Sequence, residues 1–170
     1  MTQNIQLPHS KTQQLSNKFP ISILANDIEI AGNVGSLFRV ADAFAIEKLY
    51  LTGTTAIPPK YKIRKAARSA DERIPYESAP SAIEVIQRLK SQNTKIVSLE
   101  ITSSSQDIRS FNMPQSQPIC LIIGSENTGV SQALLDLSDE TVHIPMYGEN
   151  SSMNVATSCA IALYEFVRNY

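Results

Sequence analysis

The chain has 170 residues, of which 42% are hydrophobic and 18% charged, and its formal net charge is −1. This length suits one domain with its own core, and the composition excludes both a disordered chain and a collagen-like one. No apolar run reaches the roughly 18 residues that a membrane helix needs, and the polar N-terminus lacks the apolar core of a signal peptide, so we expect a cytoplasmic protein with no membrane partner.

The two cysteines, Cys120 and Cys159, each lie among apolar neighbours in the sequence. Isolated cysteines in such runs are typical of buried free thiols. We therefore expect neither a disulfide framework nor a metal site.

The charged residues are distributed unevenly along the chain. Residues 1–73 carry ten Lys and Arg against six Asp and Glu, whereas residues 121–170 carry one against six. Five cations fall within nine positions, namely Lys60, Lys62, Arg64, Lys65 and Arg68. Such a run is either a solvated helix or loop face or a docking surface for phosphates.

The predicted elements alternate between strands and helices. The first twenty residues are polar and predict a loosely held lead-in, which leaves 21–170 as the domain. Apolar, β-favouring runs predict strands at 21–24, 48–51, 74–76, 95–99, 119–123 and 141–144, and helical periods lie near 34–45, 80–91, 130–137 and 152–168. Strand followed by helix, repeated, predicts an α/β fold with a mainly parallel sheet and helices on both faces.

The segment after the first predicted strand combines a loop with a helix. On that helix Val34, Leu37 and Phe38 belong to one apolar stripe, and Arg39 projects from nearly the opposite side. Asn33 is then either a helix cap beside a solvated arginine or part of a loop-to-helix junction that holds an anion.

A second polar segment follows the predicted strand at 119–123. Gly124 and Gly129 have the spacing of a phosphate-binding loop, but Val130 stands where that motif requires lysine, which disfavours an NTPase. The glycines also fail the patterns of dinucleotide-binding and classical Rossmann methyltransferase sites. The segment is either a simple turn with an exposed Glu126 or a binding loop of another kind.

A third polar segment follows the last predicted strand. Pro145 breaks that strand, and Ser151 or Ser152 can cap the helix that comes after the loop. The apolar face of this helix is broader than one sheet face needs, which predicts a contact between subunits over 156–167.

Three motifs therefore occur in order: N-x-G-x-x-x-R at 33–39, I-I-G-x-E-x-x-G at 122–129, and I-P-M at 144–146 followed by S-x-N-V-A at 152–156. Together they resemble the motifs of the SpoU (TrmH-like) branch of the SPOUT RNA methyltransferases. The likeness spans roughly residues 20–168. Met153 stands where many relatives have leucine, and residues 64–70 do not repeat the pattern of a particular substrate class.

The resemblance implies a C-terminal trefoil knot, a homodimer and S-adenosylmethionine as the cofactor. Glycine at position 124 would let the backbone approach the adenine closely. Without the long N-terminal RNA-binding extension of some members, the chain is expected to be a minimal catalytic domain. The implied cofactor-binding residues are Ile123, Gly124, Ile144, Met146, Ser152 and Met153.

The reaction implied is methyl transfer to a ribose 2′-hydroxyl of tRNA or rRNA. Arg39 is the implied catalytic group, and the basic run 60–68 is expected to contact the RNA. A guanidinium with a pKa above about 12 is an awkward base, so stabilisation of an alkoxide or binding of a phosphate is the simpler role, and the proton role stays open. The alternative is a non-catalytic, knotted RNA-binding protein that retains the cofactor pocket. The residues implied around Arg39 are Asn33, Glu126, Ser152 and Asn154.

Overall fold

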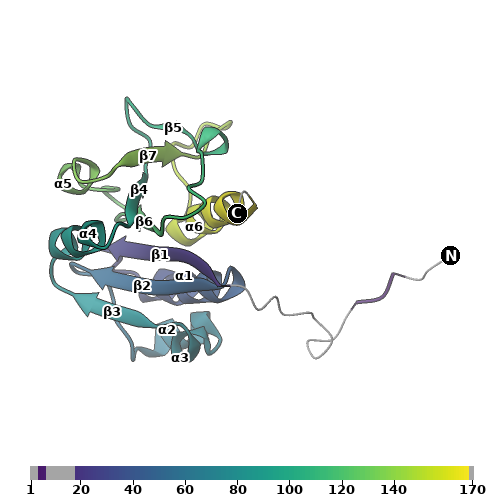
Figure 1. Cartoon of the computed structure of the whole chain (residues 1–170). Helices are drawn as coiled ribbons and strands as arrows, with labels where there is room; N and C mark the ends of the chain where they lie inside the picture. Colours follow the sequence, from purple (N-terminus) through teal and green to yellow (C-terminus); the bar gives the residue numbers. More distant parts are fainter. Residues whose placement is uncertain (1–3, 7–17, 169–170) are drawn as a thin grey trace.

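The computed structural model describes residues 4–6 and 18–168, so most of the predicted lead-in lies outside the described residues. Within these ranges the strands form one seven-stranded sheet in the order β3-β2-β1-β6-β4-β7-β5, and each neighbouring pair is parallel (Figure 1). The strands are β1 (Phe19–Asn26), β2 (Ile46–Thr52), β3 (Tyr76–Ala79), β4 (Lys95–Leu99), β5 (Gln106–Asp107), β6 (Ile119–Ile123) and β7 (Glu140–His143).

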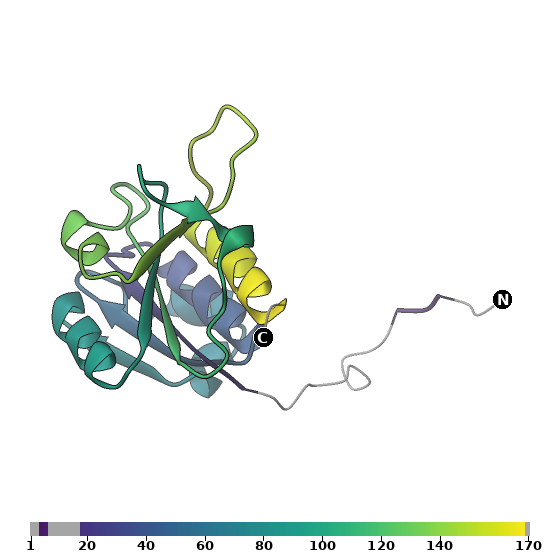
Figure 2. The ribbon, with the colours of Figure 1, turned by 45° about the horizontal axis from the view of Figure 1, so that its top comes forward.

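Helices cover both faces of the sheet. One face carries α1, α2, α3 and α6, and the other carries α4 and α5, which divides the core into two clusters. Figure 2 shows α6 lying alongside α1. The predicted parallel α/β fold is confirmed, and the trefoil knot stays a prediction. The helices are α1 (Ala31–Ala43), α2 (Tyr61–Ala67), α3 (Ala70–Arg73), α4 (Ala82–Ser91), the 3-10 helix η2 (Ile108–Ser110), α5 (Gln132–Leu135) and α6 (Val155–Arg168).

The two-sided burial explains the sequence of the central strands. In β1, Ile21 and Ile23 pack against the α1 and α6 face, whereas Leu24 packs against the α4 and α5 face. This alternation follows from the period of two in a strand. All five residues of β6 are buried because it lies between β1 and β4 with helices above and below.

The structure differs from the sequence prediction at several element boundaries. The strand predicted at 74–76 lies at Tyr76–Ala79, and the helix predicted at 130–137 is reduced to Gln132–Leu135. Most of the basic run 60–68 forms a helix, α2, which was not predicted from the sequence. Among the described residues no helix is long and apolar enough to cross a membrane.

The broad apolar face of α6 is used mostly by the core of its own chain. Cys159, Leu163 and Phe166 are fully or almost fully buried there, and the ring of Phe166 lies 5.1 Å from that of Phe111 between centroids. Only Ile161 and Tyr164 are large apolar residues of α6 that remain exposed, at 39% and 62%. The width of this face therefore gives less support to a subunit contact than the sequence indicated.

Candidate functional site: a cavity and a basic groove at one edge of the sheet

The carboxyl ends of the parallel strands bring the three polar segments to one edge of the sheet. From β1 the chain continues to β2 on one side, while β6 pairs with β1 on the other. Strand order thus reverses between β1 and β6, and such switch points are where open α/β sheets bind ligands. The segments that follow β1, β6, β4 and β7 all meet at this edge.

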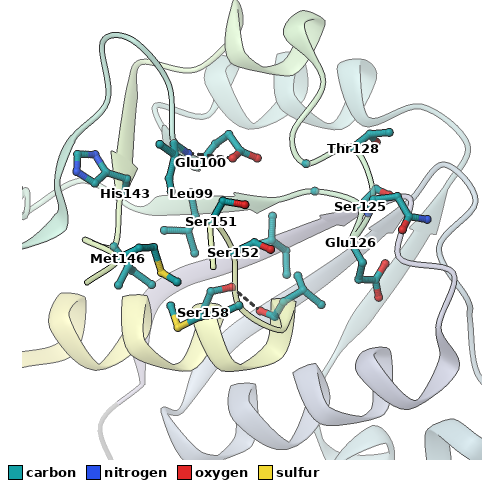
Figure 3. A pocket seen from close by; sticks show the side chains of 18 residues that line it. Leu99, Glu100, Ser125, Glu126, Thr128, His143, Met146, Ser151, Ser152 and Ser158 are labelled. Carbon is teal, nitrogen blue, oxygen red and sulfur yellow. Dashed lines mark hydrogen bonds between the residues drawn. The ribbon is translucent and has the colours of Figure 1, made fainter. Parts of the chain in front are cut away.

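A cavity of about 520 Å³ opens between the segments that follow β4, β6 and β7 (Figure 3). Its volume falls within the range of small-molecule sites. Its walls combine apolar side chains with hydroxyl groups and backbone. All six residues expected to bind the cofactor line it: Ile123, Gly124, Ile144, Met146, Ser152 and Met153.

The loop after β6 closes on itself to form one wall of the cavity. The amide of Gly129 donates to the carbonyl of Ser125 at 2.9 Å, and these two residues form an isolated antiparallel bridge. A Cβ at Gly124 would lie only 2.1 Å from the Gly129 carbonyl oxygen. Glycine at 124 is therefore required by the closure of this loop, a constraint independent of any ligand.

A chain of side-chain hydrogen bonds links the three motifs. Asn154 Nδ2 donates to Asn33 Oδ1 at 3.0 Å, and Asn33 Nδ2 donates to Glu126 Oε1 at 2.5 Å. Figure 3 shows Glu126 pointing from its loop toward α1, the helix that carries Asn33. Three residues separated by up to 121 positions in the sequence are thus joined at the switch point.

The helix caps differ from those expected. The residue before α1 is Ile30, and Asn33 lies inside the helix with its amide engaged by Glu126 and Asn154. Asn154 caps α6, because its Oδ1 accepts the amides of Ala156 and Thr157 at 3.0 and 3.2 Å. The expected cap at Ser151 or Ser152 is wrong, and Ser152 lines the cavity instead.

Arg39 lies in a second depression, a groove between α1, α2 and α6 that also contains Asn154. Its guanidinium is exposed, and among the described residues no hydrogen bond or ion pair to it is found. The same groove receives three cations of the basic run, Lys62, Lys65 and Arg68. We call these three residues with Arg39 the basic groove.

The other two cations of the run do not line the groove. Arg64 pairs with Glu72 at 3.0 Å on the surface, and Lys60 precedes α2. The five residues expected around the reaction are therefore divided between two hollows. Glu126 and Ser152 line the cavity, Arg39 and Asn154 line the groove, and Asn33 connects Glu126 with Asn154.

The environment shifts the pKa values of both cysteines and of Asp107. Cys120 and Cys159 are buried, and burial raises the pKa of each thiol to about 12. Hydrogen bonds from Arg109 lower the pKa of the half-buried Asp107 to about 2. In the part of the chain that the structure describes, no group of three or more His, Cys, Asp or Glu could hold a metal ion.

Comparison with known proteins shows to which family the chain belongs. The model of the SpoU rRNA Methylase family matches residues 20–164. The chain belongs to this family. Its match includes all three motifs, the cavity up to Ser158 and every residue of the basic groove.

Two curated family relatives and one solved structure show the degree of similarity. The 23S rRNA (uridine(2479)-2′-O)-methyltransferase of Streptomyces viridochromogenes is 36% identical over 81% of this chain and 48% of its own length. The tRNA (guanosine(18)-2′-O)-methyltransferase of Escherichia coli is 26% identical over 92% of this chain and 67% of its own. The crystal structure of the SpoU methyltransferase AviRb from Streptomyces viridochromogenes with its cofactor AdoMet superposes with a TM-score of 0.81 at 30% identity, covering 91% and 61%. The chain thus spans about half to two thirds of the length of these relatives.

Several residues that line the cavity were not singled out from the sequence. Among them are Leu99 and Glu100 at the end of β4 and His143 at the end of β7. His143 Nδ1 lies 3.0 Å from the hydroxyl of Ser105, which fixes the ring from the β5 side. An acid directly after the buried strand 95–99 is the sequence signal that could have identified Glu100, because strand ends converge at the site.

Proposed function

We propose that the protein transfers a methyl group from S-adenosylmethionine to a ribose 2′-hydroxyl of tRNA or rRNA. The observation that carries this proposal is the hydrogen-bonded chain Asn154–Asn33–Glu126, which links the cavity of the six expected cofactor residues with the groove of Arg39. Membership of the SpoU family and the names of the relatives, which act on both tRNA and rRNA, support it.

The chemistry of the cavity fits the cofactor. Ile123, Ile144 and Met146 supply apolar walls for a flat adenine, and the surrounding loops supply backbone donors and acceptors. Ser152 adds a hydroxyl for the polar parts of the molecule. When bound, the cofactor supplies an electrophilic methyl group on a positively charged sulfur.

The chain's own residues then have two tasks. They hold the ribose oxygen in line with the methyl group, and they stabilise that oxygen as its proton leaves. Arg39 suits the second task because its guanidinium stays charged, donates hydrogen bonds and lacks a competing acid partner among the described residues. Glu126 acts through Asn33, whose amide it orients, and is a positioning residue in this scheme.

The basic groove is proposed to hold the phosphate backbone of the RNA. Three exposed cations, Lys62 and Lys65 in α2 and Arg68 at its end, line the same groove as Arg39. Phosphates bound to these cations would present a ribose to that groove. Lys60, which precedes α2, and Arg64, which lies on the surface of α2, would extend the positive surface for a longer stretch of RNA.

A homodimer is also proposed, because the family resemblance implies one and α6 retains exposed Ile161 and Tyr164 one turn apart. Light scattering at micromolar concentration should give about twice the chain mass of 18.7 kDa. A value at the chain mass itself would contradict this assembly.

The decisive experiment on the function is Arg39→Ala with labelled S-adenosylmethionine and total tRNA and rRNA under single-turnover conditions. We expect transfer to 2′-hydroxyls by the wild type and a loss of about a hundredfold or more in the variant, the usual effect of removing one preorganised donor. Arg88→Ala removes an exposed arginine from the opposite face of the sheet and is the matched control. Arg39→Ala activity within about threefold of the wild type would overturn the role of Arg39.

A further inference from the structure

Glu100 connects the three walls of the cavity through its hydrogen bonds. It follows β4 directly, and its backbone amide donates to the carbonyl of Val142 in β7 at 2.9 Å. Its side chain reaches the third wall, because Oε2 accepts the amide of Val130 at 2.9 Å. Figure 3 shows Glu100 pointing from the end of β4 toward the loop that carries Ser125 and Thr128.

Both carboxylate oxygens of Glu100 are committed to backbone amides. Oε1 accepts the amide of Ile101 at 2.9 Å, so the carboxylate joins the start of the segment after β4 to the end of the loop after β6. A carboxylate can accept at both oxygens, whereas an amide side chain presents one acceptor and one donor. A carboxylate at position 100 is therefore needed to accept both hydrogen bonds.

Gly129, the residue before Val130, leaves room for the Glu100 carboxylate. Gly129 has a φ of +67°, and a Cβ there would lie 2.2 Å from Glu100 Oε2. The loop therefore reaches Glu100 through a backbone conformation and a close approach that glycine alone permits without strain. Ser125, Glu126 and Thr128 lie within the loop that this contact anchors, and all three line the cavity.

We propose that Glu100 is a positioning residue that sets the affinity of the cavity for S-adenosylmethionine by holding the loop 124–130 in its binding conformation. This inference rests on the proposed function. Glu100 acts through the loop backbone, so it governs how well the cofactor binds and leaves the reacting oxygen to Arg39. Its loss raises the KM for the cofactor with little change in kcat at saturation.

The experiment compares Glu100→Gln with Asp139→Asn in the full chain. Asp139 is a matched control because Oδ2 of this carboxylate accepts the amide of Ile96 at 2.8 Å near the other end of β4, away from the cavity. Calorimetry with S-adenosylmethionine and with S-adenosylhomocysteine measures affinity, thermal unfolding measures stability, and methyl transfer to total RNA gives KM and kcat.

We expect Glu100→Gln to weaken binding of both ligands by about tenfold or more, the effect of losing a hydrogen bond to a charged acceptor. Its KM should rise in parallel while kcat at saturation stays within about threefold, and Asp139→Asn should bind within about twofold of the wild type. Glu100→Asp, which keeps the charge but is one methylene too short for Val130, should show the same loss and serves if Glu100→Gln does not fold.

Two results would overturn the inference alone: Glu100 variants that bind within about twofold of a binding-competent wild type, or an Asp139→Asn variant that loses as much affinity as they do. A wild-type protein that binds neither ligand would overturn the proposed function itself. The wild-type titration therefore separates the two failures.

Discussion

Replacing Gly35 by alanine tests how tightly the basic helix α2 is seated on α1. Gly35 is buried inside α1, and a Cβ at this position would lie 2.4 Å from the carbonyl oxygen of Ile63 and 2.7 Å from the Cβ of Ala66. Both contacts belong to α2, and the nearer one is backbone, so a side-chain rotation cannot relieve it. To reach ordinary contact the helix α2 must retreat by about 1 Å.

The two opposing contributions to the free energy of unfolding can be compared. Overpacking of this kind costs about 1–3 kcal/mol, whereas alanine in place of glycine inside a helix gains about 0.5–1 kcal/mol. The net loss is then about 1 kcal/mol, within a range from about 0 to about 2.5 kcal/mol. In a chain of this length each kcal/mol lowers Tm by about 2–4 °C. The same retreat moves Lys62 and Lys65 away from Arg39 across the basic groove.

Urea unfolding of Gly35→Ala should therefore show the loss of stability, and titration with tRNA or rRNA should show weaker binding while cofactor affinity is unchanged. Gly32→Ala is the matched control, since it is the same substitution in the same helix and its Cβ would meet nothing within 4 Å. We expect Gly32→Ala to be neutral or slightly stabilising. A Gly35→Ala protein as stable as Gly32→Ala would refute the packing argument.

Two further predictions concern the groove and the thiols. Replacing Lys62, Lys65 and Arg68 together by glutamine should weaken RNA binding and leave cofactor affinity unchanged. Filter binding should show that the slope of log K against log salt falls by about 2–3. An unaltered slope would mean that these cations are only solvated. Cys120 and Cys159 should not react with a thiol reagent at pH 8 in the folded protein, because burial raises the pKa of each to about 12, whereas both should react in urea. Rapid labelling of the native protein would show that one of the thiols is accessible.

The sequence predicted the central strands well because most of their residues are apolar on both faces. The strands at 95–99 and 119–123 agree with β4 and β6 to the residue. The edge strand β3 was displaced because it has an alternating exposed pattern and polar residues, so propensity carries little information there. Helix α2 was missed because its apolar face is short, consisting of Ile63 and Ala67, and lies among three cations within the helix and one at each end.

The sequence singled out candidate site residues where a motif marks them, and it did not single out those that only the topology brings to the cavity. Asn33 was read locally as a possible cap, yet its side chain is used by Glu126, 93 positions away. The cap of α6 was assigned to serine because Ser151 and Ser152 precede the helix. Asn154 stands directly before the first helical residue, so its side-chain oxygen accepts the amides of Ala156 and Thr157. Glu100 has no local signature, since its role depends on the pairing of β4 with β6 and β7.

The hydrogen bonds at the switch point have a fixed polarity. A carboxylate such as Glu126 can only accept, so Asn33 must turn its NH₂ group toward it and its oxygen toward Asn154. Asn154 must then turn its own oxygen to the first turn of α6, the orientation in which it caps the helix. Glu126, in the loop after β6, thus fixes through Asn33 the orientation of the Asn154 side chain that caps α6. Aspartate at 154 would keep the cap and break one link, whereas aspartate at 33 would set two anions face to face.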